Sequence, residues 1–477
     1  MRYLIVLFSI CLAIFGCKDI PDVEEPKPLA KDSIGDVYAW QTTGNEVNLL
    51  EKQDAIDFSR EIGDFTIILD TTSTYQVMDG FGAALTGSSA YLISKLNSAD
   101  RTALLTDLFD PEKGIGLNYL RITIGSSDFS IGTYSYCESP DINSFEIPQR
   151  DKDDLIPVLR QILAINPTIK ILASPWSAPA WMKTNNNMCG GSLKGEAVYN
   201  DFAEYFVRYI KAFQAEGITI DALTIQNEPM WETSGYPTMK MLWDEQNVII
   251  RDYLGPKFVE NGIQTKIIIW DHNFDMSYYP INILNDPLTR QYVAGTGWHG
   301  YGGTATSIDA VQLLHPDKDV YFTEQSGGEW NTDTRMGNMF YYMKDFLMAS
   351  VNRGSKNFLM WNLALNPDNG PTTTTGGCQT CRGVVTVNVE GKYTRNEEYY
   401  LLGHFSKFVR LGAVRVKNSS NNLPAGVSIS SFMNTDGTKV VIIMNRSGVR
   451  QKYNIRCGSR KFIYDQLTES VVSFKFK

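Results

Sequence analysis

Eight short apolar segments, separated by stretches with helical spacing, constrain the fold of this 477-residue chain more than any other feature. The segments are, in order, QVMDGFGAAL, LNYLRITI, IKILASPW, ALTIQNEP, KIIIWDHN, VAGTGWHGY, DVYFTEQS and NFLMWNLAL. Between them, residues 199–213 (YNDFAEYFVRYIKAF) place aromatic and aliphatic side chains at i, i+3, i+4 and i+7, which is typical of a helix with one buried face. Strands that alternate with helices pair in parallel, and eight such units close a (β/α)8 TIM barrel, here expected over residues 75–370.

The two ends of the chain have a different pattern. Residues 400–477 contain short alternating segments broken by Asn, Asp and Gly, as in GVSISSFMNTDGTKVVIIMNRSG. Such alternation with turn residues predicts an antiparallel sheet. Residues 36–74, which include FTIILD, have a similar character. We therefore expect a second, smaller β domain beside the barrel.

The first 16 residues resemble the signal peptide of a bacterial lipoprotein. MRYLIVLFSICLAIFGC has one basic residue, an apolar stretch too short to span a bilayer, and a small residue before Cys17. This pattern predicts cleavage after Gly16 and acylation of Cys17, with an ordinary secretory signal as the alternative. Residues 17–35 are rich in Pro and charge and are expected to form a tether. The folded part would then face outside the cytoplasm, in contact with a membrane only through its N-terminal lipid.

Composition excludes some classes of partner. The net charge is −9 and the sequence has no concentrated basic segment, which argues against nucleic-acid binding. Nine Trp and 24 Tyr supply flat apolar rings that can stack on a ligand. No motif calls for a metal or an organic cofactor, and nothing in the sequence indicates an oligomeric state.

The cysteines fit an oxidising location. Once Cys11 has left with the signal and Cys17 carries lipid, an odd number of five remains, so at least one thiol is unpaired. For Cys378 and Cys381, in GCQTCRG, we favour a local disulfide. Half of a zinc site or a redox pair is the alternative, but no second CxxC or nearby His completes a zinc shell.

Several apolar segments end on polar or aromatic residues, at the position where barrel enzymes place their active sites. These residues are Trp176, Glu228, His299, Tyr301, Glu324 and Trp361. The two carboxylates end the fourth and seventh segments. In glycoside hydrolysis a pair of carboxyl groups acts as acid and nucleophile, and aromatic rings around them bind the sugar. The alternative interpretation is that both are strand-end residues paired with Arg or Lys in the loops.

Eight motifs, in order along the barrel and beyond it, resemble glycoside hydrolase family 30. They are GFGAALTGSSAYL, LRITIGSSDFSIGTYSY, LASPWSAPAWMKTN, GGSLKGE, NEP, SGYPT, WNLALNPDNGP and LGHFSKFV. This resemblance implies the barrel, a side β-sandwich formed by residues 36–74 with 400–477, and retention of anomeric configuration.

The resemblance also implies roles for individual residues. Glu228 of NEP matches the family's acid/base and Glu324 of FTEQS its nucleophile, for which the carboxyl groups should lie about 5 to 5.5 Å apart. Asn227 matches the Asn that holds the sugar 2-hydroxyl. Tyr301 matches a Tyr beside the nucleophile, while Trp176 and Trp361 match rings that line the first sugar subsite. His299 is a weaker candidate, because a strand-end histidine can be purely structural.

Two departures from the family pattern bear on the substrate. Members that cleave glucosylceramide carry Asp after the Thr of GFGGAxTD, where this chain has Gly87, and TTTTGGCQTCRGVV replaces a Trp- and Asn-bearing loop. Both changes favour a polysaccharide over a lipid glycoside, so we expect an enzyme that cuts β-1,6-glucan internally. Glucosylceramidase, β-xylosidase, and β-fucosidase or galactosidase activity remain alternatives within the fold. An alternative of another class is a surface lipoprotein that captures glycans without cleaving them.

Overall fold

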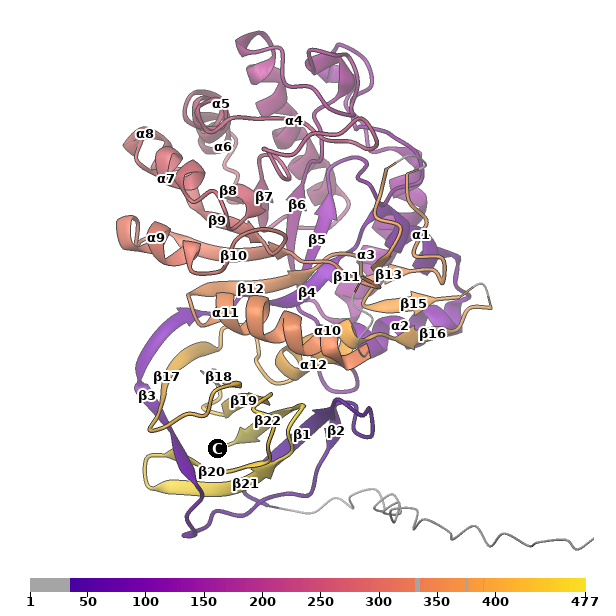
Figure 1. The fold of residues 1–477 in the computed structure, drawn as a ribbon. Helices are drawn as coiled ribbons and strands as arrows, with labels where there is room; N and C mark the ends of the chain where they lie inside the picture. The colour runs from indigo at the N-terminus through magenta and orange to yellow at the C-terminus, as the bar shows by residue number, and fades with distance from the viewer. Residues whose placement is uncertain (1–34, 331–334, 374–375, 389) are drawn as a thin grey trace, which may run out of the picture.

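The computed structural model describes residues 35–477 except 331–334, 374–375 and 389 (Figure 1). The expected lipoprotein signal, the lipidation residue Cys17 and nearly all of the tether lie outside the described residues. Two bodies are visible, a barrel ringed by helices and a smaller β domain below it in the view of Figure 1.

The barrel is built from the eight predicted segments. Its parallel strands close in the order β10-β12-β4-β5-β6-β7-β8-β9. In chain order they are β4 (Gly80–Ala84), β5 (Tyr119–Thr123), β6 (Lys170–Ser174), β7 (Ala222–Thr224), β8 (Lys266–Asn273), β9 (Val293–His299), β10 (Asp319–Glu324) and β12 (Ser355–Met360). Nearly every residue of these strands is buried, because helices cover the outside of the barrel and side chains fill the inside. The prediction of a (β/α)8 barrel is confirmed.

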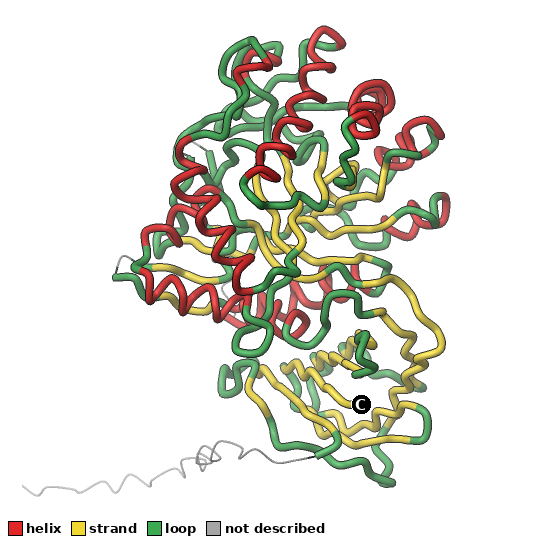
Figure 2. Tube along the Cα trace, turned by 180° about the vertical axis from the view of Figure 1, so that it is seen from behind, coloured by secondary structure: helices red, strands yellow, loops and turns green. Residues whose placement is uncertain are grey.

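Helices surround this barrel, as Figure 2 shows from behind. They are α1 (Gly87–Lys95), α2 (Ser98–Phe109), α3 (Ile156–Ile165), α4 (Glu196–Ala215), α5 (Trp243–Val248), α6 (Gly255–Glu260), α7 (Tyr278–Leu284), α8 (Pro287–Arg290), α9 (Ser307–Leu314), α10 (Arg335–Tyr342), α11 (Ala349–Val351) and α12 (Glu397–Ser406). The helix predicted from its apolar stripe is α4, and Phe202, Phe206 and Phe213 on that stripe are fully buried.

Two small sheets lie over the loops that follow β10 and β12. In one, β11 (Gly327–Gly328) pairs with β14 (Cys381–Arg382). In the other, β13 (Ala364–Leu365), β15 (Val385–Val387) and β16 (Tyr393–Arg395) pair in that order. The first sheet ties the loop after the seventh barrel strand to the chain after the eighth.

The side domain is a nine-stranded sheet with the order β2-β1-β22-β19-β18-β17-β3-β20-β21. Its strands are β1 (Val37–Thr43), β2 (Glu51–Lys52), β3 (Phe65–Val77), β17 (Val414–Ser420), β18 (Val427–Met433), β19 (Lys439–Asn445), β20 (Gln451–Cys457), β21 (Arg460–Gln466) and β22 (Ser470–Phe476). One face encloses an apolar core. Both ends of the chain contribute to this core, because β1 pairs with β22 and β3 pairs with β17. The expectation of a separate sandwich is confirmed, although its β3–β20 pair is parallel where an antiparallel sheet was expected.

The structure places the division between the two bodies differently from the sequence. Residues 397–406 form α12, which packs on both β4 and β22, so a boundary at residue 400 falls inside a helix. At the other end, β3 stays paired with β17 up to Val77, beyond the expected limit at residue 74. The strand β19 is also buried on both faces rather than alternating, because its second face joins the barrel core through Ile442.

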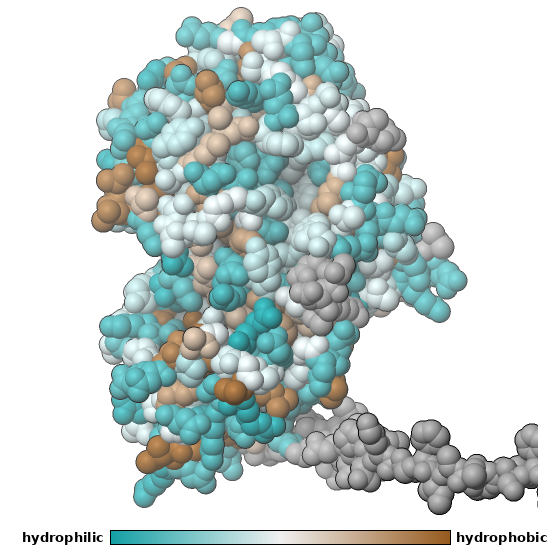
Figure 3. All heavy atoms as spheres, in the orientation of Figure 1, coloured by the Kyte–Doolittle hydropathy of each residue, from teal (hydrophilic) through white to brown (hydrophobic). Residues whose placement is uncertain are grey.

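The visible surface carries no continuous apolar area. In Figure 3 apolar side chains are scattered, with a small group at the outer edge of the barrel near α8 and α9, where Leu288, Leu313 and Leu314 are exposed. Within the part of the chain that the structure describes, no helix is both long enough and apolar enough to cross a membrane.

Candidate active site

Glu228 and Glu324 meet at the C-terminal end of the barrel. Glu324 is the last residue of β10, and Glu228 lies in the loop that follows β7. A carboxylate oxygen of each lies within 4.8 Å of the other and of a ring nitrogen of His299. This proximity agrees with the short separation of about 5 to 5.5 Å that a retaining carboxyl pair needs, and is shorter than the roughly 6.5 to 9.5 Å of an inverting pair.

Arg121 connects several residues of this site through its guanidinium group. It lies in the middle of β5, is fully buried, and forms an ion pair with Glu324 through one terminal nitrogen. The other terminal nitrogen donates to Asn227 Oδ1 and to Asp271 Oδ2, both at 2.8 Å. A buried guanidinium is stable only when its donors are satisfied, so these partners hold it and are held by it.

Each oxygen of Glu324 therefore has its own donor. Arg121 bonds Oε2, and the hydroxyl of Tyr301 donates to Oε1 at 2.8 Å. Hydrogen bonds and a positive charge of this kind favour the ionised carboxylate. The phenol remains neutral as a donor, because burial and the charge of Glu324 raise the pKa of Tyr301 well above its ordinary value.

His299 connects Glu228 to a buried carboxylate. Its Nδ1 lies 3.0 Å from Glu228 Oε1, and its Nε2 lies 3.1 Å from Asp271 Oδ1. Asp271 also accepts from Thr224 at 2.7 Å and from Ser174 at 3.1 Å. Histidine at this position is therefore part of the site rather than an isolated structural residue.

The backbone at two of these positions is left-handed. Glu228 has φ 46° and Asp271 has φ 60°, values that residues other than glycine adopt infrequently, Asn, Asp and His most often among them. The amide of Glu228 donates to the carbonyl of Asp271 at 3.0 Å, and β8 has an irregular register where Asp271 lies. This hydrogen bond stabilises both unusual conformations. Both side chains therefore point into the mouth, which is the opening at the C-terminal end of the barrel.

The charges of this group are coupled. Burial raises the pKa of Glu324, and the neighbouring Glu228 charge adds to this against the opposing effects of His299 and Arg121. For Glu228 the burial effect is outweighed by the hydrogen bond with His299 and by nearby positive charge, so its pKa is lowered. Burial lowers the pKa of His299, but the Glu324 charge and the bonds to Asp271 and Glu228 outweigh it and raise that pKa to about 9. Near neutral pH His299 thus carries a proton and is hydrogen-bonded to Glu228.

The two predicted tryptophans form one side of the mouth. Trp176 and Trp361 stack with ring centroids 4.8 Å apart and an interplanar angle of 18°, and the Arg121 guanidinium lies 4.8 Å from the Trp176 ring. Asn227 lies beside Glu228 with Oδ1 turned to Arg121, so its amide NH2 is the group that can face a sugar hydroxyl. All seven residues singled out from the sequence are therefore gathered at this end of the barrel.

Four further residues of the site escaped the sequence analysis. They are Arg121, Asp128, Asp271 and His272, and each lies within one of the segments quoted above. Asp128 is the most unusual, because burial and the charge of Glu324 raise its pKa to about 8. Its Oδ1 is buried without a hydrogen-bond partner among the described residues. A charged residue in the middle of an apolar barrel segment, such as Arg121 in LNYLRITI, is the signal that could have identified this group.

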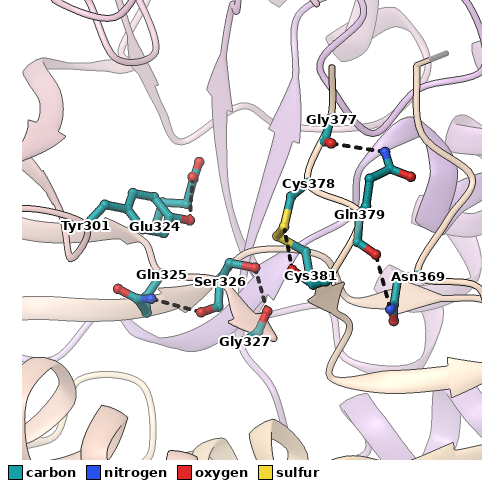
Figure 4. Close-up of a disulfide and its surroundings, with 11 residues drawn as sticks. Tyr301, Glu324, Gln325, Ser326, Gly327, Asn369, Gly377, Cys378, Gln379 and Cys381 are labelled. Carbon is teal, nitrogen blue, oxygen red and sulfur yellow. Dashed lines mark hydrogen bonds between the residues drawn. A yellow bond between two sulfur atoms is a disulfide. The ribbon is translucent and has the colours of Figure 1, made fainter. Parts of the chain in front are cut away.

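Cys378 and Cys381 form a disulfide, which confirms the favoured interpretation of GCQTCRG. Figure 4 shows it beside the Gln325–Gly327 segment that continues from Glu324. The other cysteines in the described part of the chain, Cys137, Cys189 and Cys457, are free thiols.

Glu228, His299 and Glu324 are also close enough to contact a single metal ion. Both oxygens of Glu324 and both ring nitrogens of His299 already bond to side chains, however, and the Arg121 cation lies against Glu324. A fixed positive charge in this position opposes a divalent cation. The arrangement fits a carboxyl pair better than a metal centre.

Two family models together match most of this chain. The family model of the glycosyl hydrolase family 30 TIM-barrel domain matches residues 78–409, and that of the family 30 β-sandwich domain matches residues 412–474. The chain belongs to glycoside hydrolase family 30. The barrel match extends through α12, in agreement with the packing of that helix on the barrel.

Several proteins resemble this chain over most of its length. An endo-1,6-β-D-glucanase of Aspergillus fumigatus is 34% identical over 408 residues, which cover 80% of each chain. The lysosomal acid glucosylceramidase of Mus musculus is 27% identical over 441 residues, covering 88% of this chain and 85% of its own. Among solved structures, the endo-β1,6-glucanase BT3312 superposes with a TM-score of 0.88 at 38% identity, covering 93% of this chain and 99% of its own.

Proposed function

We propose that this family 30 member is a retaining glycoside hydrolase that cuts β-1,6-glucan internally. The observation that carries the proposal is the pair of carboxyl groups, within 4.8 Å of each other, beside a stacked tryptophan pair. The linkage is supported by the likeness to endo-1,6-β-glucanases, at 34% identity in sequence and 38% in a solved structure. The named glucosylceramidase is less similar, at 27%.

Glu324 is the nucleophile in this mechanism. Its carboxylate attacks the anomeric carbon and forms a glycosyl ester, while the bond from that carbon to the leaving oxygen breaks. Arg121 and Tyr301 hold the carboxylate in one orientation and keep it ionised before the attack. When the ester forms, the negative charge on Glu324 disappears and Tyr301 loses a charged acceptor.

Glu228 is the acid and then the base. It passes a proton to the departing oxygen, and His299 supplies that proton because its Nδ1 lies 3.0 Å from Glu228. The neutral His299 keeps its second ring nitrogen on Asp271. In the second half of the reaction Glu228 accepts a proton from water as that water attacks the ester, which restores Glu324 and the original protonation of the site.

The remaining residues bind the sugar. The faces of Trp176 and Trp361 provide an apolar surface for the ring, and Asn227 donates to the hydroxyl next to the anomeric carbon. Asp128, whose pKa is raised by burial, gains a partner for its unpaired oxygen when a sugar hydroxyl occupies the site.

Gly87 supports a polymer rather than a terminal glucose as substrate. It begins α1 at the edge of the mouth, and a Cβ placed there would lie 3.2 Å from the Ser130 hydroxyl. A glycine at this position has no side chain to bind the outer hydroxyl groups of a terminal glucose. The site therefore does not select the end residue of a sugar chain.

Lipid anchoring is also part of this proposal. The sequence before residue 35 supports acylation of Cys17 and a tether, which would hold the enzyme at a bacterial membrane, facing outside the cytoplasm. Fractionation of cells that express the full chain tests this. Cys17→Ala should move the protein from the membrane to the soluble fraction, whereas unchanged fractionation would contradict lipid anchoring.

Product analysis tests the activity. The signal-free protein is incubated with linear β-1,6-glucan and, in parallel, with β-1,3-glucan, xylan and glucosylceramide, with Glu324→Gln as the matched control. A ladder of short β-1,6 oligosaccharides that the variant does not make is the expected result. Glucose alone, or activity confined to xylan or the lipid, would overturn the substrate assignment. Binding without cleavage of any glycan would favour the capture protein instead.

A further inference from the structure

We infer that the Cys378–Cys381 disulfide is a positioning element of the glycan site, which holds residues 376–382, the disulfide segment, as a wall beside the tryptophan pair. The inference rests on the proposed glycan-hydrolysing function. It concerns the shape of the mouth rather than the chemistry of the carboxyl pair.

The disulfide belongs to the same apolar cluster as the tryptophans. Cys381 is 5% exposed and packs in a cluster with Trp176, Trp361 and Phe129, and Cys378 packs on that cluster from its exposed side. The Phe129 and Trp361 rings meet edge to face with centroids 6.2 Å apart. The disulfide therefore forms part of the packing that fixes the tryptophan rings.

One end of the disulfide segment is attached to the loop of the nucleophile. The strand β14 pairs with β11, with Cys381 opposite Gly328 and Arg382 opposite Gly327. The amide of Glu329 also donates to Thr380 at 2.9 Å. Only Gln325 and Ser326 separate β11 from Glu324, as Figure 4 shows. A shift of the disulfide segment would therefore be transmitted to the Glu324 backbone.

The same end is fixed to α12 by charge. Arg382 forms ion pairs with Glu397 and Glu398, whose side chains are almost fully buried, the second at 2.7 Å. Buried carboxylates require a partner in a defined place, because an unpaired buried charge is costly. This requirement anchors β14 to α12, the helix that packs on both the barrel and the side domain.

The other end of the segment meets the loop that carries Asp128. A Cβ placed on Gly377 would lie 3.2 Å from the Asp128 carbonyl, and the side chain of Asn369 donates to Gln379 at 3.4 Å. The Asp128 carbonyl also accepts from the Thr373 amide at 2.8 Å. The disulfide segment thus spans the site from the Glu324 loop to the Asp128 loop.

The bond closes a loop with only two residues between the cysteines. Cross-linking so short a loop restricts the unfolded chain little, so its contribution to global stability is small. Its main effect is local, because Gly376 and Gly377 precede it and would otherwise give this segment wide conformational freedom. If the disulfide segment were mobile, ordering it on substrate binding would cost affinity. A segment that is already fixed by the disulfide avoids this loss.

Kinetics of the oxidised and reduced enzyme test the inference. Cys378→Ser/Cys381→Ser should raise KM for linear β-1,6-glucan roughly 5- to 20-fold, with kcat within about 2-fold and Tm within about 3 °C of the parent. Dithiothreitol should reproduce this change in the parent enzyme, in which reduction should release two additional titratable thiols. It should not affect the double variant. Cys457→Ser, which removes a free thiol from the side domain, serves as the matched control and should behave as the parent does.

Two results would overturn the inference. One is an unchanged KM in the reduced parent once the two thiols are detected, which remains decisive even if the double variant does not fold. The other is an equal loss of kcat on every substrate, which would mean that the disulfide supports folding of the site as a whole.

Tryptophan fluorescence separates failure of this inference from failure of the proposed activity. Reduction should change the emission of the parent enzyme, because the disulfide packs in the cluster of Trp176 and Trp361, and Trp361→Phe should abolish most of that change. An oxidised enzyme that is inactive on β-1,6-glucan but shows this fluorescence change would contradict only the substrate assignment. Reduction without any change in emission would contradict the positioning role.

Discussion

The Nδ1 atom of His299 lies 3.0 Å from Oε1 of Glu228, so the proposed acid of the carboxyl pair has an adjacent proton source. Because the pKa of His299 is raised to about 9, the proton is present at neutral pH and is lost above that value. The alkaline side of the pH dependence of activity then reports the pair formed by His299 and Glu228, rather than either group alone.

Replacing His299 should move this alkaline limit. In the parent enzyme kcat/KM should decline as pH rises through about 9. In His299→Asn the proton must stay on Glu228 itself, whose carboxyl group loses it at lower pH, so the decline should begin at least one pH unit earlier. A pH profile of kcat/KM on β-1,6-glucan measures this. An identical alkaline limit in both enzymes would mean that His299 does not supply the proton.

Removing the Tyr301 hydroxyl should weaken the nucleophile. Tyr301→Phe deletes the donor to Glu324 Oε1, and a hydrogen bond to a charged group contributes about 1.5 to 3 kcal/mol, so kcat/KM should fall roughly 10- to 100-fold. The pKa of Glu324 should also rise, which moves the acidic limit of the pH profile upward. Tyr278→Phe on the exposed start of α7 is the control, and an unshifted acidic limit would argue against this role for Tyr301.

Asp128 should make stability depend on pH. Its folded-state pKa of about 8 lies above its ordinary value of 3.8. Between these values the unfolded chain releases the proton while the folded protein retains it, so stability should fall as pH rises from 4 to 8. Asp128→Asn removes this contribution, and the Tm of the parent should decline by about 2 to 6 °C more than that of the variant over this interval. Parallel Tm curves would contradict the raised pKa.

Trp231 should bind the part of the glucan beyond the cleaved bond. It lies three residues after Glu228, and its amide donates to the Glu228 carbonyl at 2.8 Å. The residue is 48% exposed, and its ring nitrogen donates to the Tyr236 hydroxyl. Trp231→Ala should raise KM for the polymer about 3- to 10-fold through loss of stacking, with little effect on a small aryl β-glucoside. Tyr278→Ala removes a comparably exposed residue from the start of α7 as the control. Equal effects on both substrates would indicate a general structural defect.

The sequence predicts the barrel well, because parallel strands buried on both faces appear as short apolar segments that repeat eight times. It also predicts which residues share the mouth, since the chain direction of each strand determines which end carries the site. The partners of those residues were harder to find. Asp271 follows Trp270 within an apolar segment, and only the left-handed turn at these two residues, with φ 60° and 75°, brings its carboxylate to His299 and Arg121.

The side domain was harder to delimit than the barrel. The segment of α12 contains Tyr399, Leu401, Leu402 and Phe405, all buried, so it has no polar face that would mark it as a surface helix. It is buried all round because it lies between the barrel and the sandwich, and such an element has no clear periodicity in the sequence. The double burial of β19 has the same cause.

Trapping the covalent intermediate tests the central claim most directly. The enzyme is treated with an activated 2-deoxy-2-fluoro-β-glucoside, whose fluorine slows the breakdown of the ester, and its peptides are then analysed by mass spectrometry. We predict that the mass of one fluoroglucosyl group appears on the peptide that contains Glu324, and that Glu324→Gln remains unlabelled. A label on any other residue, or an unlabelled enzyme whose first product has inverted configuration, would contradict the assignment of Glu324 as the nucleophile of a retaining glycosidase.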